Sequence, residues 1–231
     1  PRPIVLMEKH INASRVLCPS VCGDSRYLGA FLPSTPLQDL LTAACGPLIM
    51  TSGNRSGSSI ITRDEEMLAL ESPDLAGVLY NTREILTPLD DSIVQMAAGH
   101  PQVIRRSRGF VPSPVSLSVE TARGCVILAA GSDLKASFCF AAGDKAYPGQ
   151  YFGDLEDYGV YRSYLQGLQH MQQLLGIEPS AIACDLHPGY LSSRYARKAA
   201  FESKLPLLPI QHHHAHIASV IAEHHLQGKV L

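Results

Sequence analysis

Short apolar runs separated by Gly, Pro and polar residues fill the first half of the chain. Each run has the length of a β-strand, and Gly or Pro beside it is typical of a turn. Two stretches instead carry apolar residues at helical spacing after a possible capping residue, Thr35 or Thr62. The mixture predicts an α/β or α+β unit. Its expected helices cover residues 36–44 and 64–69, and its expected strands cover residues 4–7, 28–32, 48–51, 78–80, 92–96 and 103–105.

The second half alternates more regularly. Three apolar runs come first, and a long helical stretch over residues 157–175 then ends at Gly176, a typical helix C-terminus. Three strands in a meander followed by alternating helices and strands is the order of an actin-like ATPase lobe, whose mixed sheet carries helices on both faces. The expected strands are residues 126–130, 137–142, 145–151, 181–185 and 205–210, and the later helices are residues 190–203 and 217–225.

Residues 109–120 have no helical or strand period, and their prolines and serines favour a loop. We therefore predict a domain over residues 1–112, a linker over residues 113–124 and a second domain over residues 125–231. A chain of 231 residues is long enough for two cores. Because the chain starts without Met and ends as another apolar run begins, we expect it to be a segment of a longer protein.

Composition narrows the class of protein. A hydrophobic content of 45% with 17% charged residues is typical of globular chains, and no apolar run is long enough for a membrane span. No secretory leader pattern is seen at the N-terminus. The six cysteines are scattered, and some lie in apolar runs, which favours reduced, buried thiols and a cytoplasmic location. With 19 basic against 21 acidic residues, a nucleic-acid surface is not indicated.

Four histidines lie within QHHHAH, residues 211–216, between a strand-like run and a helical run. Residues four apart share one face of a helix, so His212 and His216 can bind one ion while His213 and His214 point elsewhere. A pair of this kind fits a zinc or iron site that keeps an open position for chemistry, and loops at the carboxyl ends of strands hold ligands in α/β sheets. The alternative is a polar helix start. Glu223 is the only acidic residue that follows the motif.

A loop rich in donors, TSGNRSG at residues 51–57, directly follows an apolar run. Its N–H and O–H groups can close around phosphate oxygens, with Ser52 and Asn54 as the expected donors. Ser, Gly and Asn also simply form turns, which is the alternative interpretation.

Further polar clusters follow other strand-like runs. Arginines at positions 105, 106 and 108 can bind a polyphosphate bidentately, and Ser92 with its two preceding aspartates lies near the same expected sheet edge. In the second half, Asp133 and Lys135 can ligate Mg²⁺ and phosphate. The alternatives are a solvated basic edge, capping groups and the polar tip of a hairpin. Asp185 ends a strand at the ligand-bearing edge and is a further candidate.

Taken together, several motifs in order resemble the HypF-type carbamoyltransferases that help to mature nickel-iron hydrogenases. The resemblance covers nearly the whole chain and implies a YrdC-like α/β part followed by one lobe of an actin-like (ASKHA) transferase domain. The motifs are LIMTSGNRSG, LDDSI, IRRSRGF, GSDLK, GDLED, DLHPGYLSSRYA and QHHHAH.

The resemblance also implies a reaction. Carbamate from carbamoyl phosphate is joined to ATP, with Mg²⁺, as carbamoyl adenylate, and the carbamoyl group passes to the C-terminal cysteine of a HypE-type partner. Zinc or iron is implied at His212 and His216. The residues that match the family's nucleotide-contacting positions are Ser52, Asn54, Ser92 and Arg105. No catalytic residue is assigned.

The same resemblance implies that parts of both sites lie outside the chain, before Pro1 and beyond Leu231. We therefore expect the 231-residue chain by itself to lack transfer activity. Two alternatives stay open. One is a transferase that places a carbamoyl or threonylcarbamoyl group on tRNA, against which the near-neutral charge and the absence of Trp argue. The other is a scaffold that binds metal and nucleotide without turnover.

Overall fold

The computed structural model describes residues 1–10, 18–21, 23–54, 58–70 and 72–229, which form two units that are not consecutive segments of the chain. The first unit consists of Pro1–Gly53 and Leu89–Phe110, and the second consists of Asn54–Pro88 and Val111–Leu231. The predicted boundaries at residues 112 and 125 stay a prediction. The packing divides the chain differently because residues 54–88 cluster with the second unit, where the Gln150 side chain donates to the Pro88 carbonyl oxygen at 2.6 Å.

The first unit is built on a four-stranded sheet in the order β2-β1-β3-β4. β1 is parallel to β3 and antiparallel to β2, and β3 and β4 form an antiparallel hairpin. The helix α1 (Pro36–Cys45) begins as expected, because the Thr35 side chain accepts a hydrogen bond from the Gln38 N–H at 3.2 Å. The strands are β1 (Ile4–Glu8), β2 (Tyr27–Ala30), β3 (Ile93–Ala97) and β4 (His100–Arg105), and a short 3-10 turn covers Pro19–Val21.

The second unit is built on a six-stranded mixed sheet in the order β10-β9-β6-β7-β8-β5. β6, β7 and β8 form the antiparallel meander, and β9 and β10 continue the sheet in parallel beyond β6. This is the expected strand order of an actin-like lobe. The strands are β5 (Val115–Ser116), β6 (Val126–Ala129), β7 (Cys139–Ala142), β8 (Lys145–Pro148), β9 (Ala181–Asp185) and β10 (Leu207–Ile210).

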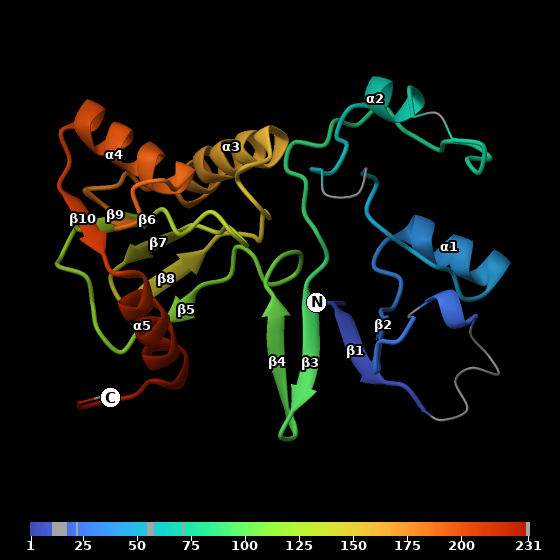
Figure 1. The fold of residues 1–231 in the computed structure, drawn as a ribbon, viewed down its shortest axis with the longest axis horizontal. Helices are drawn as coiled ribbons and strands as arrows, with labels where there is room; N and C mark the ends of the chain where they lie inside the picture. The colour runs from blue at the N-terminus through green and yellow to red at the C-terminus, as the bar shows by residue number, and fades with distance from the viewer. Residues whose placement is uncertain (11–17, 22, 55–57, 71, 230–231) are drawn as a thin grey trace. The chain divides into compact units, whose positions relative to one another are not determined.

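Two long helices, α3 (Tyr158–Leu175) and α4 (Leu191–Ser203), lie together along one side of this sheet (Figure 1). The α3 residues that face the sheet recur at three- or four-residue spacing and are Val160, Tyr164, Leu168 and Met171. Gly176 ends α3 in the left-handed conformation, with φ 62°, as predicted.

Aromatic rings fill the core beneath α3. Phe138 and Phe152 both contact the Tyr164 ring, with centroids 5.8 and 5.5 Å away, and Tyr164 has no solvent exposure. The Tyr164 hydroxyl donates to the Ala130 carbonyl oxygen at 2.7 Å, so the one polar atom of this ring is satisfied inside the core.

Several local predictions were wrong. Residues 48–51 and 78–80 form no strand, and the side chains of Ile49 and Leu79 are largely exposed. A strand needs a neighbouring strand to which its backbone can hydrogen-bond, and a local apolar run does not show whether there is one. The short helix α2 (Asp64–Leu68) is preceded by Arg63, not Thr62, and has no side-chain cap. Residues 109–120, in which no strand was expected, contain β5, which pairs with β8; the bounds of the linker stay a prediction.

Cysteine exposure varies along the chain. Cys22 lies outside the described residues, and the cysteines within them are free thiols, as expected. Cys184, in the apolar run of β9, is buried, whereas Cys18 and Cys45 are exposed. None of the described helices is long and apolar enough to cross a membrane.

Candidate metal and nucleotide sites

The carboxyl ends of β9 and β10 create the site around the histidine motif. These strands are parallel, with Asp185 in register with Ile210, so the residues that follow them emerge at the same sheet edge. The Leu186 N–H donates to the Ile210 carbonyl oxygen at 3.1 Å and extends the pairing past the strand. Directly after Ile210, Gln211 begins the helix α5 (His212–His224). Asp185 is thereby brought beside His212.

α5 begins five residues before the predicted start at Ile217, so the histidine motif forms the first turns of the helix. The Gln211 side chain accepts a hydrogen bond from the His212 N–H at 2.8 Å and so caps the helix itself. With His212 and His216 both helical, their rings share one face, as the spacing predicts.

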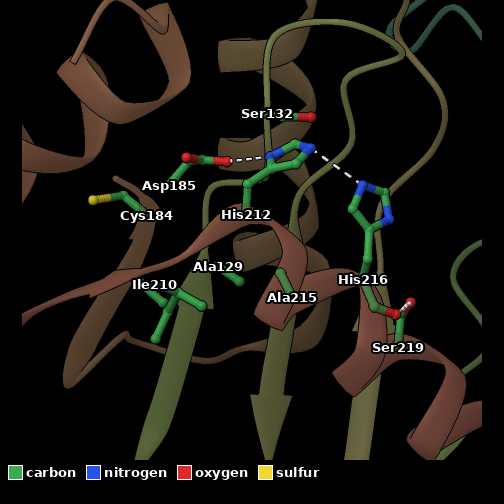
Figure 2. A pocket seen from close by; sticks show the side chains of 11 residues that line it. Ala129, Ser132, Cys184, Asp185, Ile210, His212, Ala215, His216 and Ser219 are labelled. Atoms are coloured by element: carbon green, nitrogen blue, oxygen red, sulfur yellow. Dashed lines mark hydrogen bonds and ion pairs between the residues drawn. The ribbon is translucent and has the colours of Figure 1, made fainter. Parts of the chain in front are cut away.

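The rings of His212 and His216 meet at their Nε2 atoms, 3.1 Å apart (Figure 2). Two nitrogens bound to one tetrahedral zinc ion at about 2.0–2.1 Å lie about 3.3 Å apart, so this separation suits a shared ion. The arrangement fits half of a four-coordinate metal site.

On the other side of the His212 ring, the Asp185 Oδ2 atom lies 2.5 Å from Nδ1. Figure 2 shows His212 between Asp185 and His216. Burial raises the pKa of Asp185, but the hydrogen bonds with His212 and with the His187 N–H outweigh it, and the pKa lies below its ordinary value. Asp185 is therefore an ionised acceptor at neutral pH.

Asp185 does not supply the third ligand, because it occupies the ring nitrogen of His212 that faces away from His216. Among the residues that the structure describes, no group of three or more His, Cys, Asp or Glu side chains is placed to hold a metal ion. The described part of the chain thus offers two nitrogen ligands and a carboxylate behind one of them. The metal role of His212 and His216 stays a prediction.

A pocket of about 260 Å³ opens beside the histidine pair. Its polar lining includes Ser132 and Ser219, whereas much of its wall consists of small residues, Ala129, Gly131, Ala183 and Ala215. His213 and His214 line a different pocket, together with Ile217 and Ile221. The four histidines therefore divide between two faces of α5, as the spacing predicts.

The loop after β6 shapes this pocket from the other side. Gly131 has φ +73°, and a Cβ at that position would lie 2.0 Å from the Ser137 carbonyl oxygen, so only glycine fits. The buried Asp133 carboxylate accepts hydrogen bonds from the N–H groups of Leu191 and Ser192 and from the Ser192 hydroxyl, at 2.7, 3.0 and 2.9 Å. Asp133 thus caps α4 and is not the open polar tip of a hairpin, which was one of the two interpretations of this turn. Its role as a ligand of Mg²⁺ or phosphate stays a prediction.

In the first unit, the structure brings Ser92 and Arg105 together at one end of the β3–β4 hairpin. Ser92 is fully buried: its hydroxyl donates to the Arg108 carbonyl oxygen at 3.0 Å and accepts from the Ser107 N–H at 2.8 Å. Arg105 is half-buried and donates through Nε to the Asp91 carbonyl oxygen at 2.9 Å. Their nucleotide-binding roles stay predictions.

Ser52 and Asn54 are not brought together within one unit, because Ser52 belongs to the first unit and Asn54 to the second. The Asn54 side-chain amide donates to the Ser58 carbonyl oxygen at 3.0 Å. Residues 55–57 of the predicted phosphate loop lie outside the described residues.

The contact of Asp185 with His212 was missed, although the place of Asp185 at the end of a predicted strand was noted. Two rings of the same turn were missed as well: His187 stacks on Tyr190 with centroids 4.2 Å apart, and Tyr190 meets the His212 ring edge to face at 6.5 Å. The parallel pairing of β9 with β10 is the signal that could have found this group, because it places the turn after β9 beside His212.

Comparison with known proteins agrees with the two-part fold. Residues 1–107 match the Sua5/YciO/YrdC family described as "Telomere recombination", and residues 122–223 match the family described as "HypF Kae1-like domain". The carbamoyltransferase HypF of Synechocystis sp. is 36% identical over 96% of this chain. A HypF of Rhizobium leguminosarum bv. viciae is 33% identical over 100% of it. The chain spans only 28% and 30% of these two proteins.

Two solved structures are similar throughout. A structure titled full-length HypF in the phosphate- and nucleotide-bound form covers 100% of this chain with a TM-score of 0.87 and 38% identity, and this chain covers 35% of it. The structure of T. kodakarensis HypF covers 98% of this chain, with the same TM-score of 0.87 and 33% identity, and this chain covers 29% of it. The fold and the paired histidines define a chain that joins a YrdC-type segment to a Kae1-like segment. The chain belongs to the HypF family of carbamoyltransferases.

Proposed function

We propose that this chain is part of an enzyme that activates carbamate with ATP and passes the carbamoyl group to the C-terminal cysteine of a HypE-type partner. The product serves cyanide ligand synthesis in nickel-iron hydrogenase maturation. One observation carries the proposal: the Nε2 atoms of His212 and His216 converge at the ligand-bearing edge of an actin-like sheet, in a chain that resembles HypF proteins over 96% of its length.

The first step is adenylation. Water hydrolyses carbamoyl phosphate to carbamate and phosphate. A carbamate oxygen then attacks the α-phosphorus of ATP, with Mg²⁺, and pyrophosphate leaves as carbamoyl adenylate forms. The Arg105 guanidinium provides positive charge beside the phosphates in this step, and its hydrogen bond to the Asp91 carbonyl oxygen orients it. Ser52 and Asn54 contribute donors to the phosphates, and Ser92 holds the turn that carries Arg108.

The second step is transfer. The partner's thiolate attacks the carbamoyl carbon, the bond to the phosphate oxygen breaks, and AMP leaves. His212 and His216 would hold a zinc or iron ion, which would supply a Lewis acid for the carbamoyl oxygen. The pocket of about 260 Å³ beside the two rings leaves room for the small carbamoyl group.

The proposal places the reaction in the cytoplasm, in keeping with the free thiols among the described cysteines. A protein acceptor is favoured over tRNA because 19 basic residues are balanced by 21 acidic ones, and the chain has no Trp for base stacking.

The test uses the full-length protein and separates the two steps. We expect Ser52→Ala and Asn54→Ala to lower carbamate-dependent exchange between ATP and pyrophosphate, because they act before activation. We expect His212→Ala and His216→Ala to leave exchange largely intact and to abolish arrival of the carbamoyl group on the HypE cysteine. Each loss should be about 100-fold or more in its own step.

Asn81→Ala is the matched control for Asn54→Ala, since Asn81 only accepts a local hydrogen bond from the Arg83 N–H. It should leave both steps unchanged. If the two His variants abolish exchange as fully as the Ser52 and Asn54 variants do, a single shared site replaces the two-step division. Carbamoylation of tRNA in place of HypE would refute the protein acceptor, and absence of both products would leave the scaffold interpretation.

A further inference from the structure

The Asp185 carboxylate is fixed from several sides. Its Oδ1 atom accepts a hydrogen bond from the His187 N–H at 2.8 Å, and its Oδ2 atom faces His212 Nδ1. Its own carbonyl oxygen accepts from the Ser193 hydroxyl at 3.0 Å, which ties the end of β9 to α4. The Asp185 side chain is only 9% exposed. Neither carboxylate oxygen is therefore free to rotate away from its partner.

A carboxylate oxygen is a hydrogen-bond acceptor, and Asp185 Oδ2 lies 2.5 Å from His212 Nδ1, so this contact favours the ring tautomer that carries its proton on Nδ1. The lone pair is then on Nε2, the atom that faces His216. Metal ions bind the lone pair of a neutral imidazole, and the partner of the other ring nitrogen selects which nitrogen carries it.

We propose that Asp185 is a positioning residue that holds His212 in the Nδ1–H tautomer, with Nε2 directed at a metal ion shared with His216. The inference rests on the proposed function only in that the histidine pair binds a divalent cation. By this inference, Asp185 at the end of β9 contributes to metal affinity in addition to the two histidines.

Substitution by Asn distinguishes this role from a purely structural one. In Asp185→Asn, the amide oxygen can still accept from the His187 N–H, so the turn after β9 is preserved. The amide NH₂ then faces His212 Nδ1 and donates to it, which moves the ring proton to Nε2 and blocks the metal. Asp185→Ala removes both contacts and leaves the tautomer unbiased. A carboxylate-to-amide change behind a catalytic histidine has this effect in serine proteases.

The experiment measures binding of Zn²⁺ and of Co²⁺ to the full-length protein and its variants, together with the His212 tautomer from ring ¹⁵N shifts. His212→Ala identifies the His212 signals. We expect Asp185→Ala to weaken metal binding about 10-fold and Asp185→Asn about 100-fold, the range for loss of a carboxylate behind a metal-bound histidine. In the metal-free chain, the ring proton should move from Nδ1 to Nε2 in Asp185→Asn only. Asp144→Asn is the control, since Asp144 is exposed on a hairpin and pairs with Lys145.

We expect the midpoints of thermal unfolding of the same variants to follow the opposite order. The midpoint of Asp185→Asn should be nearer to that of the unsubstituted protein than the midpoint of Asp185→Ala, because Asn keeps the turn. If metal affinity instead follows stability, with Asn milder than Ala, the role is structural and the inference is wrong. Equal affinity of Asp185→Asn and the unsubstituted chain overturns this inference alone. Absence of metal binding by the unsubstituted full-length protein overturns it together with the metal part of the proposed function.

Discussion

Replacing Asp133 with Ala tests whether this carboxylate is a structural cap. The change removes the acceptor for the Leu191 and Ser192 N–H groups and for the Ser192 hydroxyl, at the first turn of α4. Loss of a side-chain cap costs about 0.5–2 kcal/mol. Buried donors without a partner cost about 1–3 kcal/mol more, in part relieved by water. We therefore expect a loss of about 2–4 kcal/mol in the free energy of unfolding of the second unit.

Tyrosine fluorescence during urea unfolding measures this loss. The chain has no Trp, and of its nine tyrosines all but Tyr27 lie in the second unit, so the signal reports that unit. The urea midpoint should fall with an unchanged slope. Asp133→Asn keeps one acceptor oxygen and should lie between Ala and the unsubstituted chain.

Asp144→Ala is the matched control, because the Asp144 side chain is 55% exposed and lies 3.4 Å from Lys145. A change within about 0.5 kcal/mol is expected there. If Asp133→Ala unfolds at the same urea concentration as Asp144→Ala, the capping bonds do not stabilise α4 and the reasoning fails.

Two further predictions follow from the histidine pair and the core. In the full-length protein, His212→Ala and His216→Ala should each abolish zinc binding, whereas His213→Ala should retain most of it. Equal loss in all three would contradict the shared face of α5. Burial, with smaller effects from neighbouring tyrosines, raises the pKa of Tyr164. The folded state then keeps a proton that the unfolded chain loses near pH 10, so stability should fall as the pH rises above about 10. Tyr164→Phe should flatten that fall in urea midpoints, and the exposed Tyr158→Phe should not; an unchanged slope in Tyr164→Phe would refute the assignment.

The fold of the second unit was largely predictable because its helices and strands have clear signals in their own local sequence. α3 carries a continuous apolar stripe and ends at a glycine, and β9 was predicted with its observed bounds, Ala181–Asp185. The exposed runs at residues 48–51 and 78–80 were mispredicted as strands, since composition says that a segment can pair but not whether a partner strand lies beside it.

In the candidate site, too, the local contacts could be predicted from the sequence and the long-range contacts could not. Two histidines four apart on one helix converge by local geometry, so His212 and His216 could be paired from the sequence. The contact of Asp185 with His212 spans 27 residues and exists only because β9 and β10 are neighbours in the sheet. Likewise, the capping bonds of Asp133 could not be predicted because their partner, the start of α4, is 58 residues away.

The discontinuous units have a practical consequence for dissecting this protein. The chain passes between the two units at residues 53–54, 88–89 and 110–111, so no single peptide-bond cleavage separates one from the other. A truncation at the family boundary near residue 107 would yield a C-terminal piece without residues 54–88, which cluster with it. After a single proteolytic nick at one of these crossings, the two fragments should therefore stay associated until the protein is denatured.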